Sequence, residues 1–240
     1  PPRPGPFSPK GLPQKEELAW SSARLGAIEI NATFRTNQSP ASFRKWKAES
    51  APDVVFPVKG PQFVTHIKRL RDVEVPLANF FASGVLALGE KLGPIVWQLP
   101  PNMTFDAGRL ADFLALLPRT PAEAVALAQK HDDRLKGEPW LDTAGITQIR
   151  HALEARHKSF ATPELLALLR ARNVALVTAD TADWPWLDTT ADFAYGRLQG
   201  APGSDRYTAA DLDRWAERAA ALRDGTPLAE GPHIGPAAGA

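Results

Sequence analysis

The stretch ATPELLALLRARNVALVTAD (residues 161–180) holds a helix signal followed directly by a strand signal. Thr162 supplies a side-chain oxygen at an N-cap position, and Pro163 suits the first helical position because no backbone N–H is needed there. The apolar pattern predicts a helix over 163–172, and the β-branched run after it predicts a buried strand that ends at Asp180. A helix that leads into a buried strand is half of the repeating unit of a parallel α/β fold.

Five other short runs share this apolar, β-branched or aromatic character. They are AIEIN (27–31), DVVFPVKG (53–60), PIVWQLPP (94–101), RHALEAR (150–156) and DFAYGRLQG (192–200). The sequence predicts a helix over 13–24 before the first run, and helices over 40–50, 74–91 and 106–117 between later runs. Strand and helix therefore alternate along the chain, which indicates a parallel sheet with right-handed crossovers.

Further helix starts repeat the pattern of a capping oxygen at the N-cap. They are Ser39 with Pro40, Thr120 with Pro121, and Thr208 with Asp211, the last opening a helix that stops at Gly225. The interval between the strands at 94–101 and 150–156 is longer than one strand–helix unit. The Ala-rich segment 120–140 fills this interval, and we interpret it as an inserted helix within an insertion at 119–149.

Six predicted strands are two fewer than a closed (β/α)₈ barrel requires. One interpretation is an open, doubly wound sheet. The other, which we adopt, is a TIM-barrel-like parallel α/β barrel that is incomplete, with the first and last strands missing. We expect one domain over 1–224 and a flexible Gly/Pro/Ala linker or loop over 225–240.

Composition removes several classes of function. The net charge of +1 argues against general polyanion binding, although HIKRLR (66–71) is a basic cluster. The absence of cysteine excludes thiolate sites and fits a reducing compartment, so we expect a cytoplasmic protein. No apolar run is long enough to cross a bilayer. The nucleotide-binding motifs, the G-x-S-x-G elbow and H-E-x-x-H are all missing, so we expect no nucleotide cofactor.

Polar residues stand where the predicted strands end. They are Glu29, Asn31, Lys59, Gln98, Glu154, Arg156, His157, Asp180 and Arg197. In a parallel α/β fold the carboxyl ends of the strands share one face, where ligands bind, so we expect these side chains to surround one opening. His66 follows the second strand at loop distance and could reach the same opening.

These residue types support two interpretations. In the first, the residues form a functional site. Three carboxylates and an imidazole would be catalytic or would bind a divalent metal: Glu29, Glu154, Asp180 and His157. The remaining residues would hold a small phosphate or carboxylate: Asn31, Lys59, His66, Gln98, Arg156 and Arg197. As structure, the cations would simply neutralise the carboxylates in buried ion pairs. The metal, the substrate and the oligomeric state stay open.

The linked motifs IEINATF, FPVKGPQFVTHIKRLRD, GPIVWQLPPN, IRHALEARHKSF and DFAYGRLQG resemble those of the YecE-like proteins, or domain of unknown function family 72. The likeness covers about residues 5–223. It implies a TIM-barrel-like fold with a polar pocket at the strand ends, and no established reaction. The chain departs from the family pattern at Arg35, where a TFYR-like turn lacks its Tyr, and at Gln199, where a His is common.

Three functions follow as hypotheses. The first is an acid/base or metal-assisted enzyme, a hydrolase, lyase or isomerase, that acts on a small anionic compound. The second is a non-catalytic nucleic-acid- or protein-binding module that uses HIKRLR and the loop of Trp184 and Trp186. The third is a truncated, inactive scaffold. The first predicts that Glu154→Gln abolishes turnover and leaves the melting temperature unchanged or higher.

Overall fold

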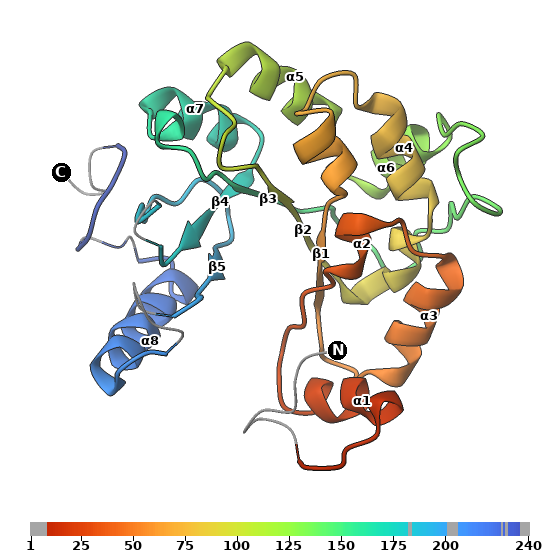
Figure 1. Cartoon of the computed structure of the whole chain (residues 1–240), viewed down its shortest axis with the longest axis horizontal. Coiled ribbons are helices and arrows are strands. Elements are labelled where there is room, and N and C mark those ends of the chain that lie inside the picture. The colour runs from red at the N-terminus through yellow and green to blue at the C-terminus, as the bar shows by residue number, and fades with distance from the viewer. Residues whose placement is uncertain (1–8, 182–183, 201–205, 227, 229, 236–240) are drawn as a thin grey trace. The chain divides into compact units, whose positions relative to one another are not determined.

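The computed structural model of the protein describes residues 9–181, 184–200, 206–226, 228 and 230–235 (Figure 1). The chain divides into two compact units, which are described separately. The first consists of Pro1–Phe63, Asp72–Ile95 and Pro118–Ile149, and the second of Val64–Arg71, Val96–Leu117 and Arg150–Ala240. In the part of the chain described, no helix has the length and apolar character needed to span a bilayer.

The sheet confirms the predicted strands. Its strands are β1 (Phe56–Lys59), β2 (Leu92–Gln98), β3 (His151–Glu154), β4 (Val174–Ala179) and β5 (Tyr195–Arg197). They neighbour one another in chain order, and the β3–β4 and β4–β5 pairs are parallel. The predicted strand at 27–31 is present as parallel bridges from Ala27 and Ile30 to residues 55 and 58. This topology is an α/β fold of the incomplete TIM-barrel-like kind.

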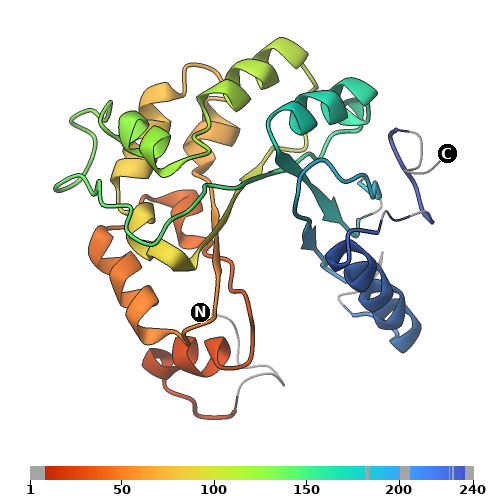
Figure 2. The ribbon, with the colours of Figure 1, turned by 180° about the vertical axis from the view of Figure 1, so that it is seen from behind.

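The first unit contains most of the N-terminal helices. These are η1 (Gln14–Glu16), α1 (Glu17–Ser22), α2 (Ala32–Arg35), α3 (Pro40–Glu49), α4 (Glu74–Ala82), η3 (Val85–Lys91) and α6 (Pro121–Ala128). Helix α4 packs along α6, side by side in both views (Figures 1 and 2), and α3 packs against η3. The inserted helix is confirmed as α6, which is shorter than predicted because residues 129–150 form an irregular loop.

The single helix predicted over 74–91 is two helices, and Gly84 separates them. Its φ is +117°, and a Cβ there would lie 2.6 Å from the Cα of Pro40. Only glycine accepts both the backbone angle and the close approach. The first turn of α3 therefore lies directly against this break.

The second unit holds the other helices. They are the π-helical turn η2 (Phe63–Ile67), α5 (Ala107–Leu116), η4 (Lys158–Phe160), α7 (Pro163–Ala171) and α8 (Ala209–Arg223). Helix α7 packs on β4 and against α5 (Figure 1). The predicted caps are confirmed at α3, α6, α7 and α8, where each N-cap hydroxyl accepts the N–H of the residue three positions later.

Strand alternation in the second unit gives the sheet two distinct faces. One face carries a core cluster of Val96, Ala152, Ala175 and Val177, with Tyr195 packed against it. The other face packs against helix α5, where the fully buried Trp97 ring meets the Phe113 ring edge to face, with 5.3 Å between the ring centres. The core-cluster face is thus the face turned away from α5, and it leads at the strand ends to the polar residues described next.

Part of the tail lies on the loop after β4. Leu187 donates its N–H to Pro232 O (3.0 Å), and the buried Asp188 carboxylate accepts the N–H groups of Ile234 (2.7 Å) and Gly235 (3.2 Å). Flexibility of the whole segment 225–240 stays a prediction.

Candidate functional site

On three strands of the second unit, a polar residue follows two positions after a residue that packs in the core cluster. The pairs are Val96 and Gln98 on β2, Ala152 and Glu154 on β3, and Tyr195 and Arg197 on β5. Because side chains alternate with a period of two, each polar residue emerges on the same face as the core cluster. A backbone hydrogen bond from Leu99 to Glu154 (2.9 Å) aligns the ends of β2 and β3.

Glu154 is the centre of this arrangement, with a side chain only 2% exposed. Gln98 donates Nε2–H to both carboxylate oxygens, at 2.9 Å each. Arg156 Nε donates to Oε1 at 2.8 Å, and Arg197 Nη1 donates to Oε2 at 2.5 Å. The carboxylate thus accepts four donor contacts, which occupy about its full capacity.

Burial raises the pKa of the Glu154 carboxyl, but the charge of Arg197, the hydrogen bond from Gln98 and the charge of Arg156 together outweigh burial. The net pKa lies below the ordinary value of 4.5. Glu154 is therefore ionised at neutral pH. This one carboxylate faces two guanidinium groups, those of Arg156 and Arg197.

A cavity of about 260 Å³ lies beside this cluster. Glu154, Arg156, Trp184 and Gln199 are among the residues that line it. Trp184 belongs to the loop that the second hypothesis assigns to a binding surface, and it lines the cavity, whereas Trp186 is not among the lining residues. Pro101 and Thr181 also line it and were not predicted. They follow closely after the ends of β2 and β4, so extending each strand end by three residues would have included them.

Two residues that line this cavity carry N–H donors with no acceptor within the described residues. Arg156 uses Nε on Glu154, and no partner is present there for its two Nη groups, while its side chain is 37% exposed. The indole Nε1–H of Trp184 is fully buried and likewise has no acceptor among those residues. A buried N–H without an acceptor costs roughly 1–3 kcal/mol. The Arg156 Nη groups are therefore the donors that a ligand in the cavity could meet, whereas the Trp184 N–H is enclosed by protein.

The second unit also holds three more of the predicted residues. His157 caps η4, and its Nδ1 accepts the N–H of Ser159 at 3.2 Å. Asp180 follows β4 and accepts the indole N–H of Trp215 of α8 at 3.1 Å. His66 lies in η2, with Nδ1 2.8 Å from the hydroxyl of Thr65. None of these contacts involves Glu154.

Glu29, Asn31 and Lys59 belong to the first unit. Glu29 is half-buried, Asn31 is exposed at the start of α2, and Lys59 ends β1 with its ammonium 4.1 Å from the Phe34 ring centre. Their convergence with Glu154 on one opening stays a prediction.

The surroundings of Glu154 do not favour a metal cation, because two guanidinium groups already contact its carboxylate oxygens. Throughout the described ranges, no group of three or more His, Cys, Asp or Glu side chains is arranged to hold a metal ion. In the basic segment 66–71, Arg69 donates to Asn102 Oδ1 (3.3 Å) and Asn102 O (2.9 Å). The φ angles of Arg69 (+50°) and Leu70 (+68°) are left-handed, so this segment is held in a strained turn.

Two solved structures resemble this fold. A DUF72 family protein from Thermotoga maritima MSB8 has a TM-score of 0.66 at 22% identity, with 91% of this chain and 82% of that chain covered. A DUF72 family protein from Enterococcus faecalis V583 has a TM-score of 0.65 at 12% identity, with 88% and 83% covered. At these identities the likeness establishes the fold. No curated protein matches the chain.

The sequence of residues 1–232 matches the family described as "Protein of unknown function DUF72". The match spans nearly the whole chain of 240 residues. It agrees with the resemblance carried by the strand-end motifs, since YecE-like is another name for the same family. The chain therefore belongs to the DUF72 family, a family whose function is unknown.

Proposed function

We propose that this protein binds a small compound through its phosphate or carboxylate group, in the cavity beside Glu154. The observation that carries the proposal is Arg156, which lines that cavity and whose Nη groups meet no acceptor among the described residues. Arginine presents its N–H groups as a planar fork that matches the oxygens of a carboxylate or phosphate. The side chain of Trp184 lines the same cavity and can report on a ligand there.

In this proposal Glu154 orients the two arginines and does not accept a proton from the ligand. A general base works best with a pKa near the working pH, whereas the arginines and Gln98 hold the pKa of Glu154 below its ordinary value. Its lone pairs are also engaged by four donor contacts. The carboxylate fixes Arg156 through Nε and leaves the remaining edge of the guanidinium directed to a ligand.

The accessible guanidinium of Arg156 supports an anionic ligand. Arg197 is mostly buried, with 18% of its side chain exposed, and Arg156 is more accessible. Arg156 shares the Glu154 carboxylate with Arg197, so an anion in the cavity would place a negative charge beside the more accessible guanidinium. A charge-assisted hydrogen bond contributes about 1.5–3 kcal/mol.

The test is a titration of ¹⁵N-labelled protein with inorganic phosphate and with acetate, followed through the indole N–H signal of Trp184. A Trp184→Phe variant assigns the signal. Arg156→Ala removes the proposed anion donor, and Lys158→Ala is the matched control because Lys158 is an exposed cation two residues away that does not line the cavity.

We expect a saturable shift of the Trp184 signal with at least one of the two anions. Arg156→Ala should weaken binding about tenfold or more, which corresponds to about 1.4 kcal/mol. Lys158→Ala should leave the affinity within about twofold, as expected for an exposed charge. A Trp184 signal that does not respond to either anion, or that responds equally in both variants, would refute the proposal.

A further inference from the structure

A second and larger cavity, of about 580 Å³, lies within the first unit. Its walls come from the C-terminal half of α3, from η3 and from the irregular loop 129–150. It shares no lining residue with the cavity beside Glu154. Its volume falls in the range of about 300–1,000 Å³ that is usual for small-molecule pockets.

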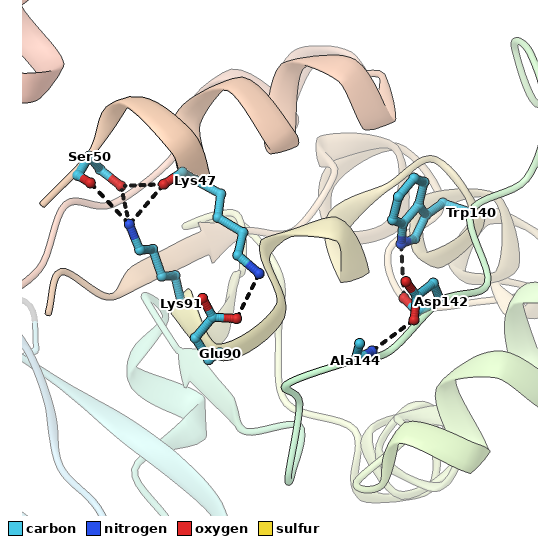
Figure 3. Close-up of polar contacts among 7 residues, drawn as sticks. All are labelled: Lys47, Ser50, Glu90, Lys91, Trp140, Asp142 and Ala144. Atoms are coloured by element: carbon cyan, nitrogen blue, oxygen red, sulfur yellow. Dashed lines mark hydrogen bonds and ion pairs between the residues drawn. The ribbon is translucent and has the colours of Figure 1, made fainter. Parts of the chain in front are cut away.

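The loop 129–150 is long for a connection without helix or strand, and such loops are commonly functional. Its backbone is nevertheless held at defined points. Trp140 donates its N–H to Ala82 O at the end of α4 (2.8 Å), and Ile149 donates to Arg119 O (2.8 Å). The indole Nε1–H of Trp140 donates to Asp142 O at 2.8 Å (Figure 3). These bonds hold the indole at the cavity wall.

Two glycines make room for an ion pair on the opposite wall. Lys47 Nζ donates to Glu90 Oε2 at 2.6 Å (Figure 3). Gly89 has a φ of +57°, and a Cβ there would lie 2.5 Å from Lys47 Nζ. Gly145 has a φ of +84°, and its Cβ would lie 2.8 Å from Glu90 Oε2. The backbone thus approaches both ends of the pair at positions that only glycine tolerates.

The lining residues have an excess of positive charge. Lys91 is 7% exposed, and it donates to Lys47 O (2.8 Å), Ser50 O (3.1 Å) and Ser50 Oγ (2.8 Å), all neutral oxygens at the end of α3 (Figure 3). The guanidinium of Arg44 lies 5.4 Å from the Trp140 ring centre. Within the described residues it has no carboxylate partner. With Lys47, these cations outnumber the carboxylates of Glu90 and Asp142 by one.

We propose that this cavity binds a small organic anion that carries a flat ring. The ring would lie against Trp140 and the apolar floor of Leu86 and Ala87, and the acidic group would meet Arg44 and Lys47. An indole face favours a planar partner, and an unpaired guanidinium favours an oxyanion. Lys91 would not bind the ligand directly, because its three N–H donors are already occupied. Its charge still adds to the positive potential of the cavity.

The experiment uses phenyl phosphate as the probe, with phenol as the uncharged ring and inorganic phosphate as the ringless anion. Binding to the ¹⁵N-labelled full chain is followed through the indole signal of Trp140, assigned with Trp140→Phe. Arg44→Ala removes the proposed anion donor. Lys45→Ala is the matched control, since this neighbouring cation has 66% of its side chain exposed and does not line the cavity.

We expect phenyl phosphate to shift the Trp140 signal saturably and to bind about tenfold more tightly than either phenol or inorganic phosphate. Arg44→Ala should weaken it about fivefold or more, and Lys45→Ala by less than about twofold. The proposal is overturned by a Trp140 signal that does not respond, by equal affinity in the wild type and Arg44→Ala, or by phenol or inorganic phosphate binding as tightly as phenyl phosphate. The separate Trp184 signal keeps this outcome distinct from that of the Glu154 cavity.

Discussion

Replacing Glu154 with glutamine removes the carboxylate that accepts hydrogen bonds from Gln98, Arg156 and Arg197. The glutamine side chain would offer one carbonyl oxygen where two carboxylate oxygens now stand. Its amide NH₂ would then point toward a donor. The guanidinium groups of Arg156 and Arg197 would also lose the negative charge that both of them contact. This loss would occur in the protein interior, because the Glu154 side chain is only 2% exposed.

The expected cost is about 3–5 kcal/mol of unfolding free energy, the range found when one partner of a buried ion pair is removed. The structural interpretation of Glu154 therefore predicts the opposite of the catalytic-base interpretation, in which stability would be unchanged or higher. The measurement is urea denaturation followed by tryptophan fluorescence at neutral pH.

Glu217→Gln is the matched control, because this glutamate is exposed on α8 and the same substitution there should change the free energy by less than about 0.5 kcal/mol. A double-mutant cycle of Glu154→Gln with Arg197→Gln should give a coupling of about 0.5–3 kcal/mol. If Glu154→Gln proves no more destabilising than Glu217→Gln, Glu154 is not the organising partner of the arginines.

Three further predictions concern the same contacts and the fold. Because the folded-state pKa of Glu154 lies below 4.5, its stabilising contribution is complete above that value and is lost as the pH falls through the lower folded pKa. The stability difference between wild type and Glu154→Gln should therefore shrink on acid titration, and a difference that grows would contradict this sign. Thr120→Ala removes the capping box of α6 and should cost about 1 kcal/mol in urea denaturation, with no change if the cap is unimportant. Gly84→Ala should cost about 1–3 kcal/mol in the same assay, because the added Cβ would meet Pro40. Gly137→Ala is the control: Gly137 also has a positive φ, but no atom lies within 4 Å of its Cβ position, so the cost should be smaller. Equal costs would mean that crowding plays no part.

The strands and helix starts could be predicted from the sequence because their signals are local. An N-cap oxygen at Thr162 followed by Pro163, and an apolar run over 174–179, each specify an element from neighbouring residues alone. The break at Gly84 was missed because its cause is a distant residue, Pro40, which comes close only in the folded chain. Four-residue α2 was missed because so short a helix has no periodicity to detect.

The candidate site could be predicted only in part, for the same reason. The sequence analysis expects Glu154 and Arg156 to face the same opening, and these two residues are in contact. Which of the polar strand ends would pair with Glu154 depended on strand order and register, and these bring Gln98 and Arg197 to the carboxylate. The cavity lined by Lys91 and Trp140 was not predicted, since its walls come from segments that are distant in sequence and carry no motif.

Anion binding beside Glu154 can be observed in a crystal of the protein soaked with selenate, whose anomalous signal marks a tetrahedral oxyanion. We expect a selenate peak in the cavity beside Glu154, within hydrogen-bonding distance of the Nη groups of Arg156. The same soak of Arg156→Ala should give no peak there. Wild-type crystals in which this cavity holds only water, while selenate binds elsewhere, would show that the cavity is not an anion site.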